Sequence, residues 1–214
     1  MKGAENETNR GSDSRALILA AAERVFAQSG FAGARTDDIA AKAGVNKALL
    51  YYYFKSKEAL YDAVLEDHFK EFNRQALEVL TGPGSAREVL LRYISMHFDF
   101  ISERHRHASL FQQFMSAGGK RSEELVRQYF TPRIKAFGAL LERGMSDGEF
   151  RRSDRFHTAL SIVALIVFYF SAEPVLRMLG YSDPYSEQNL KLRKQEVLDF
   201  INHGMFTKPE SSSK

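Results

Sequence analysis

The sequence predicts an all-α protein of about nine helices, with a small three-helix N-terminal domain followed by a larger helical domain. Apolar residues recur every three or four positions along most of the 214 residues, which is the period of a helix that buries one face. No segment shows the strict alternation of a half-buried strand. Hydrophobic residues make up 44% of the chain and aromatic residues 12%, which is enough for a core and too much for a disordered protein.

Each of the first two predicted helices ends at a glycine. Apolar spacing over Leu17–Phe26 predicts a helix, which Gly30 ends. Thr36 is a suitable N-cap for a short helix that runs to Ala43, with two acidic residues in its first turn. Gly44 ends this second helix.

Two more helices complete the pattern before the clearest break in the chain. Asn46 can cap a short helix that runs to about Tyr53, and Ser56 can cap a long helix after it. Gly82-Pro83-Gly84 then interrupts the helical pattern.

Five further helices are predicted beyond this break. Ser85 and Glu88 have the spacing of a capping box at the start of the first of them. Pro132 lies inside a helical pattern, where we expect a kink rather than an end. The predicted ranges are Ser85–Glu103, His107–Ser116, Ser122–Met145, Asp154–Leu179 and Glu187–Met205.

Charge and cysteine content exclude several function classes. Lys and Arg number 30 and Asp and Glu number 27, so a net charge of +3 does not by itself imply a nucleic-acid partner. With no cysteine, the chain has no disulfide scaffold, no thiolate metal site and no cysteine nucleophile. We therefore expect any nucleic-acid partner to meet a local concentration of basic residues.

The ends of the chain and its most apolar run indicate a cytoplasmic protein with no membrane partner. The first residues are polar and lack the apolar segment of a secretory signal. The run Ala159–Ala172 has 14 residues, fewer than the roughly 20 that cross a bilayer. The expected organisation is a disordered arm over 1–12, a small helical domain over 13–59, a larger helical domain over 60–206, and a disordered tail over 207–214.

Basic and aromatic residues are concentrated over Ile39–Lys57. This stretch contains no Asp or Glu, four lysines, and the four consecutive aromatic residues Tyr51–Phe54. Compact positive charge together with phenolic and backbone donors is what phosphate binding requires. Two short helices joined by a tight turn at Gly44 make a helix-turn-helix, whose second helix can enter the major groove of DNA. A solvated surface helix is the alternative interpretation.

Helical spacing suggests a role for each residue of the second short helix. Val45, Leu49 and Phe54 are expected to pack against the helix before it. Asn46 and Lys47, near the helix start, are placed to meet base edges. The residues expected at phosphates are Tyr51 and Tyr52, through their hydroxyls, and Thr36, at a helix N-terminus.

These segments resemble the N-terminal domain of the TetR family of bacterial transcription regulators. The resemblance runs from about Ser14 to Val64 and includes Thr36–Ala40, Ala43–Lys47 and Leu50–Leu60. It implies a three-helix DNA-binding head, a helical body that binds a small molecule, two-fold dimers, and release of the operator on ligand binding. The residues that match the family's DNA-contacting positions are Thr36, Asn46, Lys47, Tyr51, Tyr52, Lys55 and Lys57.

Two helices of the body are expected to form the dimer contact. The predicted helix Asp154–Leu179 is apolar around most of its circumference, so one neighbouring helix would not cover it. Packing it and the last helix against their symmetry copies would give a four-helix contact. The alternative is that the first is the central helix of a monomer. The last helix presents an apolar face through Leu190, Val197, Leu198 and Ile201.

Aromatic and methionine residues of the body suggest an apolar cavity with a few polar groups. A large apolar effector, aromatic or fatty-acyl, would suit this composition, although plain core packing is the alternative. No cofactor or metal is expected, because no Glu-x-x-His pair or phosphate-binding glycine loop occurs. The candidate ligand-binding residues are His97, Phe98, Phe114, Met115, Phe130, Phe168, Tyr169 and Glu173.

The function that these predictions favour is a ligand-responsive, DNA-binding transcriptional regulator, a repressor that a small apolar molecule releases from a palindromic operator. The alternative from another class is a helical small-molecule-binding protein or enzyme with no DNA role. A catalytic bundle would present acid and histidine pairs to its interior. Asp154 with His157 and Asp199 with His203 have helical spacing, but we expect these histidines at the surface or at helix ends. We therefore do not expect an enzyme.

Overall fold

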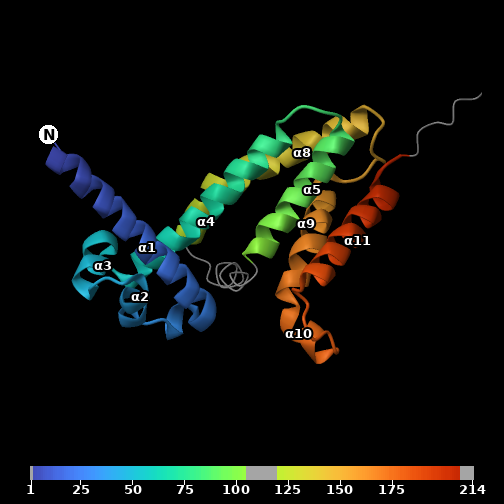
Figure 1. Ribbon diagram of the computed structural model, residues 1–214. Coiled ribbons are helices and arrows are strands. Elements are labelled where there is room, and N and C mark those ends of the chain that lie inside the picture. The colour runs from blue at the N-terminus through green and yellow to red at the C-terminus, as the bar shows by residue number, and fades with distance from the viewer. Residues whose placement is uncertain (1, 105–119, 208–214) are drawn as a thin grey trace, which may run out of the picture. The chain divides into compact units, whose positions relative to one another are not determined.

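The computed structural model describes residues 2–104 and 120–207, and helices connected by short turns make up these ranges (Figure 1). Within them β-structure is limited to one isolated bridge between Phe150 and Phe206. The chain divides into two compact units. Of the described residues, the N-terminal unit contains 2–70 and 120–123, and the C-terminal unit contains 71–104 and 124–207. The predicted helix over 107–116 lies outside the described residues.

The first helix, α1, spans Lys2–Gly33 and is interrupted at Gly30, whose backbone has φ 67° and ψ 172°. The predicted end at Gly30 is therefore a break, after which the chain makes one more turn. The helix also includes residues 2–12, for which composition predicts a disordered arm. Its inner face buries Ile18 and Phe26 completely.

Three helices follow in the N-terminal unit: α2 (Thr36–Ala43), α3 (Lys47–Phe54) and the beginning of α4 (Lys57–Leu80). Their core is built from Ile39, Leu50 and Leu60, which are fully buried. The predicted packing of α3 was wrong in one position, because Leu50 is buried and Leu49 is only half-buried. Leu50 and Phe54 are four residues apart, so they share the inner face of α3.

The C-terminal unit contains the rest of α4 and the helices that follow it. The capping box at α5 is confirmed, since Ser85 Oγ accepts from the Glu88 amide and the Glu88 carboxylate accepts from the Ser85 amide. The remaining helix α7, Lys120–Leu125, crosses the boundary between the units at Glu123. The bounds within the C-terminal unit are α5 Ala86–Glu103, a π-helical turn Val126–Phe130, α8 Thr131–Ser146, α9 Arg155–Ser171, α10 Glu173–Met178 and α11 Glu187–Met205.

Proline positions set two departures from regular α-helix. The expected kink at Pro132 is present as the π-helical turn Val126–Phe130 directly before α8. A proline lacks the N–H that would complete the preceding turn, and a wider turn accommodates this loss.

The predicted continuous helix Asp154–Leu179 was wrong, because the chain breaks at Ala172 into α9 and α10. Pro174 is the cause, since it cannot donate to the carbonyl of Phe170. That carbonyl instead accepts a hydrogen bond from Tyr185 Oη at 2.8 Å. The carbonyl of Phe170 therefore keeps a hydrogen-bond partner at the break.

The core of the C-terminal unit contains a buried histidine among aromatic rings. His97 is 5% exposed, and its ring lies 4.5 Å from the ring of Phe72 and 5.6 Å from that of Tyr93. Burial, with a smaller contribution from the positive charge of Arg133, lowers the pKa of His97 to about 3. The imidazole is therefore neutral in the folded chain at neutral pH.

The buried imidazole predicts loss of stability in mild acid. In the unfolded chain the histidine regains its ordinary pKa of about 6.5, so below that pH the unfolded state binds a proton that the folded state does not. We expect the free energy of unfolding to fall by about 2 kcal/mol between pH 7.5 and pH 5, before most carboxylates titrate. Urea unfolding of wild type and His97→Phe, at equal protein concentration, measures this. A pH dependence that the variant shares in full would contradict the assignment.

Candidate functional site

The turn between α2 and α3 fixes how the candidate DNA-binding surface is presented. Gly44 has left-handed backbone angles of φ 69° and ψ 27°. Its N–H donates to Ala41 at 3.2 Å, and the N–H of Val45 donates to Ala40 at 3.0 Å. This pair of bonds is a Schellman motif, which ends α2 so that only three residues separate it from α3.

Asn46 starts α3 as its N-cap, as predicted. Its side-chain oxygen accepts from the amide of Leu49 at 2.7 Å. This bond leaves the exposed side-chain amide nitrogen as the group that can donate to a base edge.

Lys47, the predicted base reader, forms an exposed ion pair with Asp37 of α2. Lys47 Nζ lies 2.9 Å from one carboxylate oxygen of Asp37 and 3.0 Å from the other. The hydrogen bond of this pair lowers the pKa of Asp37 and raises that of Lys47. Because both side chains are about half exposed, the pair contributes little to stability, and Lys47 can exchange it for a contact to DNA.

The hydroxyls of Thr36 and Tyr51 lie 3.3 Å apart and link α2 to α3. The predicted N-cap role of Thr36 was wrong, because α2 is preceded by Arg35 and Thr36 is its first residue. Thr36 is only 9% exposed, so its side chain supports Tyr51 more directly than it faces solvent. Tyr52 is 67% exposed and available to a partner.

Lys55 occupies a strained turn at the end of α3. Its φ is 60°, a value that favours glycine, and the Ser56 amide donates to Phe54 across it at 2.6 Å, which makes a γ-turn. Lys55 is the only non-glycine residue with positive φ among residues 2–104 and 120–207. Its ammonium lies 5.4 Å from the ring centre of Tyr52. The turn therefore holds a cation beside an exposed phenol.

Lys57 differs from the other predicted DNA-binding residues. Its ammonium donates to the carbonyl of Ala32 at 3.4 Å and lies 4.7 Å from the ring centre of Phe31. It therefore binds the end of α1 in the free chain. The structure brings together five of the seven predicted residues on one exposed surface, which we call the α3 surface: Asn46, Lys47, Tyr51, Tyr52 and Lys55.

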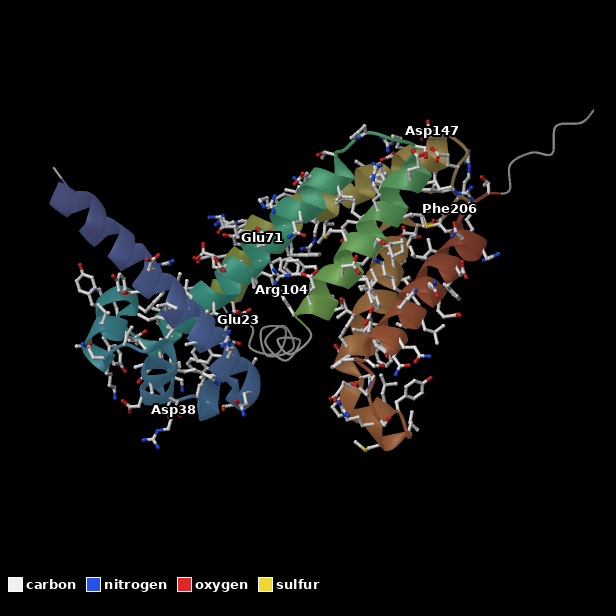
Figure 2. All side chains as sticks on the ribbon, viewed as in Figure 1. Glu23, Asp38, Glu71, Arg104, Asp147 and Phe206 are labelled. Atoms are coloured by element: carbon white, nitrogen blue, oxygen red, sulfur yellow. The ribbon has the colours of Figure 1, made fainter. Side chains whose placement is uncertain are left out.

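Sequence reasoning missed Arg35. This exposed residue directly precedes α2, and its positive charge acts on both members of the Asp37–Lys47 pair. The feature of the sequence that could have identified it is a basic residue at the start of the helix-turn-helix, shortly before the acid-free stretch. Figure 2 shows the side chains of α2 and α3, with Asp38 labelled on α2.

The candidate ligand-binding residues do not line one cavity. His97 faces Phe72 of α4, whereas Phe98, the next residue, packs on Phe170 of α9 at 5.2 Å. Phe168 is 70% exposed, because consecutive helical residues point about 100° apart and Phe170 takes the inner position. Phe114 and Met115 lie outside the described residues.

The two remaining polar candidates make local contacts at the break between α9 and α10. The hydroxyl of Tyr169 donates to the carbonyl of Pro184 at 2.6 Å. Glu173 pairs with Arg177 one turn later. Of the predicted ligand-binding residues that the structure describes, His97 and Phe130 remain as candidates for one site. Both lie near the side chain of Arg133.

Comparison with known proteins supports the same division of the chain. Residues 18–64 match the family described as bacterial regulatory proteins of the tetR family, and residues 86–201 match the tetracyclin repressor-like C-terminal domain. The regulator RutR of Escherichia coli is 33% identical to this chain, over 73% of this chain and 74% of RutR. The chain belongs to the TetR family.

Other relatives agree with this membership. The transcriptional repressor NicS of Pseudomonas putida is 27% identical over 86% of this chain and 87% of NicS. A solved structure from Saccharomonospora viridis, of a transcriptional regulator in complex with choline, superimposes with a TM-score of 0.73 at 23% identity, over 92% of this chain and all of that chain. That likeness shows the shared fold.

As a TetR-family member the chain is a transcriptional regulator that binds DNA and a small molecule, and it is not an enzyme. Over residues 2–104 and 120–207 the helices are too short or too polar to span a membrane. In the same ranges no three His, Asp or Glu residues gather as metal ligands would.

The strained turn at Lys55 predicts opposite effects on stability and on DNA binding. We expect Lys55→Gly to raise the free energy of unfolding by about 1 kcal/mol, because glycine adopts positive φ without a steric cost. The same change removes a cation from the α3 surface and should weaken DNA binding at low salt. Thermal unfolding and DNA titration measure the two effects. The control is Lys42→Gly in the last turn of α2, where the backbone is helical and glycine should not stabilise.

Proposed function

We propose that this TetR-family regulator is a cytoplasmic homodimer that represses transcription from a palindromic operator and is released by a small, largely apolar molecule. The observation that carries this proposal is the α3 surface, where polar and basic side chains are exposed on a helix held by the Gly44 turn. Relatedness to NicS, a repressor by name, supports the negative sign of regulation. A solved relative in complex with choline supports a small-molecule effector.

Exposed apolar side chains on α9 and α11 support the dimer. Phe156, Leu160 and Phe168 of α9 are between 57% and 70% exposed and lie at spacings of four and eight residues, so they form one stripe. On α11, which contacts α9, Leu192 and Phe200 are also exposed (Figure 1). A stripe of this kind is typical of an interface that a single chain leaves uncovered.

The face of α11 predicted for this contact needs correction. Val197 and Ile201 are buried within their own chain, and Leu190 and Leu198 are half-buried. The predicted face therefore packs inward. Between α9 and α11 the chain leaves an open groove of about 360 Å³, lined by Ile162, Leu165 and Phe200 among others, that a partner side chain can enter.

Operator recognition by the α3 surface predicts different roles for Lys47 and Tyr52. We expect Lys47→Ala to weaken binding to the protein's own upstream DNA about 10- to 100-fold and to flatten its preference over scrambled DNA, because a base contact is lost. Tyr52→Phe removes one phosphate hydrogen bond and should weaken both DNAs by a similar, smaller factor.

The control for Lys47 is its partner. Lys47→Ala leaves the Asp37 carboxylate unpaired near phosphate, so the change is also made in an Asp37→Asn background, where only the base contact is lost. Gel-shift titrations at fixed salt give the affinities, and circular dichroism checks the fold. Equal weakening of operator and scrambled DNA by Lys47→Ala in that background would refute its role as base reader.

Charges placed on the apolar stripe should disrupt the dimer. We expect Phe168→Asp with Phe200→Asp to yield monomers and to abolish operator binding, since an unpaired charge in a dry contact costs several kcal/mol and two half-sites then lose their link. Light scattering after size-exclusion chromatography measures the mass. Lys135→Asp, an exposed change on α8, is the control. A double variant that remains a normal dimer would place the interface elsewhere.

A further inference from the structure

A cation in the C-terminal unit is enclosed by aromatic rings. Arg133 lies in the first turn of α8, and its side chain is half-buried. Its guanidinium carbon is 4.7 Å from the ring centre of Phe72 in α4 and 4.7 Å from that of Phe130 in the π-helical turn. The faces of these rings attract the cation but carry no charge that neutralises it.

Arg133 forms no ion pair or hydrogen bond with the residues that the structure describes. Arg104 provides a contrast, because its guanidinium stacks on Phe100 at 4.2 Å and also pairs with Glu103 at 3.4 Å (Figure 2). Burial lowers the pKa of Arg133, yet a guanidinium remains protonated at neutral pH. An enclosed positive charge that no described residue neutralises favours binding of an anion.

A buried polar group without a partner lies close to Arg133, on α5. Nδ1 of His97 is buried and has no hydrogen-bond partner, and the ring of His97 and the guanidinium of Arg133 both contact Phe72. A neutral imidazole can donate one hydrogen bond to an anion without adding charge to the site.

The rings around these groups suit an apolar ligand body. Phe72 lies 5.0 Å from Phe100, and Tyr93 lies 4.7 Å from Phe137. Ligand sites of this kind combine mostly apolar walls with a few convergent polar groups. The polar component here is one unpaired guanidinium, which is suited to a carboxylate or sulfonate group.

We propose that Arg133 is the anion-binding group of the effector site, and that the effector is an organic anion with an aromatic or aliphatic body. This inference rests on the proposed function, since it identifies the chemical class of the small molecule that the regulator binds. His97 is assigned as a second polar contact to the anion, and Phe72 and Phe130 as walls that hold the guanidinium.

Two fluorescent dyes test the charge requirement. 8-Anilinonaphthalene-1-sulfonate is an anion, and N-phenyl-1-naphthylamine has the same ring system without the sulfonate. We expect the full chain to bind the anionic dye at least about tenfold more tightly than the neutral one. Arg133→Gln should remove this preference by weakening the anionic dye about tenfold or more, with the neutral dye changed less than about twofold.

Matched variants and competitors complete the test. Arg127→Gln, an exposed arginine of the π-helical turn, should leave both affinities unchanged, and Arg133→Lys should retain part of the preference. Decanoate should displace the anionic dye from wild type, whereas decanol should not. If circular dichroism shows that Arg133→Gln is unfolded, the dye affinities of Arg133→Lys and the decanoate and decanol competition on wild type decide the test.

Equal affinity of wild type for the two dyes, or unchanged affinity of folded Arg133→Gln for the anionic dye, would overturn the proposal. Displacement of the dye by decanol as readily as by decanoate would also overturn it. These titrations contain no DNA. The dye result can therefore contradict the effector assignment while gel-shift titrations still show operator binding, or support it while operator binding is absent. Failure of the effector assignment is thereby distinguished from failure of the proposed function.

Discussion

The left-handed backbone at Gly44 is the constraint on which the DNA-binding surface depends. The two hydrogen bonds of the turn require this positive φ, at which a residue with a Cβ would be strained. The turn lets α3 begin at Lys47, with only three residues between it and the end of α2. Leu50 and Phe54 can then reach the core of the N-terminal unit while Asn46, Lys47 and Tyr52 stay in solvent. The exposure of the α3 surface thus follows from a short turn and one buried helix face.

The two units use positive charge in different ways. On the α3 surface, Lys47 is held by an exposed pair with Asp37 that is weak and exchangeable, which suits a protein that must find and leave DNA. In the C-terminal unit, Arg133 is enclosed by rings, and no described carboxylate neutralises it. A charge in that position is costly until an anion arrives, and this cost is the basis of the effector site proposed for Arg133.

Prolines shape the body of the protein. Pro132 is the second residue of α8, which follows the π-helical turn, so that Arg133, the next residue, lies in the first turn of α8. Pro174 separates α9 from α10, and Tyr185 replaces the hydrogen bond that the proline removes. The apolar stripe on α9 therefore ends close to this break.

The sequence alone determined the helical class, the helix-turn-helix and most of the α3 surface, because these depend on local signals: apolar period, glycine turns, caps and a run free of acids. It also located the capping box at Ser85, which involves only neighbouring residues. Only the tertiary structure decided which apolar positions face inward. Leu50 rather than Leu49, and Val197 rather than Leu192, are buried because of the helices that happen to lie beside them. The pairing of Lys47 with Asp37, and the lack of a partner for Arg133 among the described residues, were equally out of reach, since an interaction between separate helices is set by their packing and not by the period within either one.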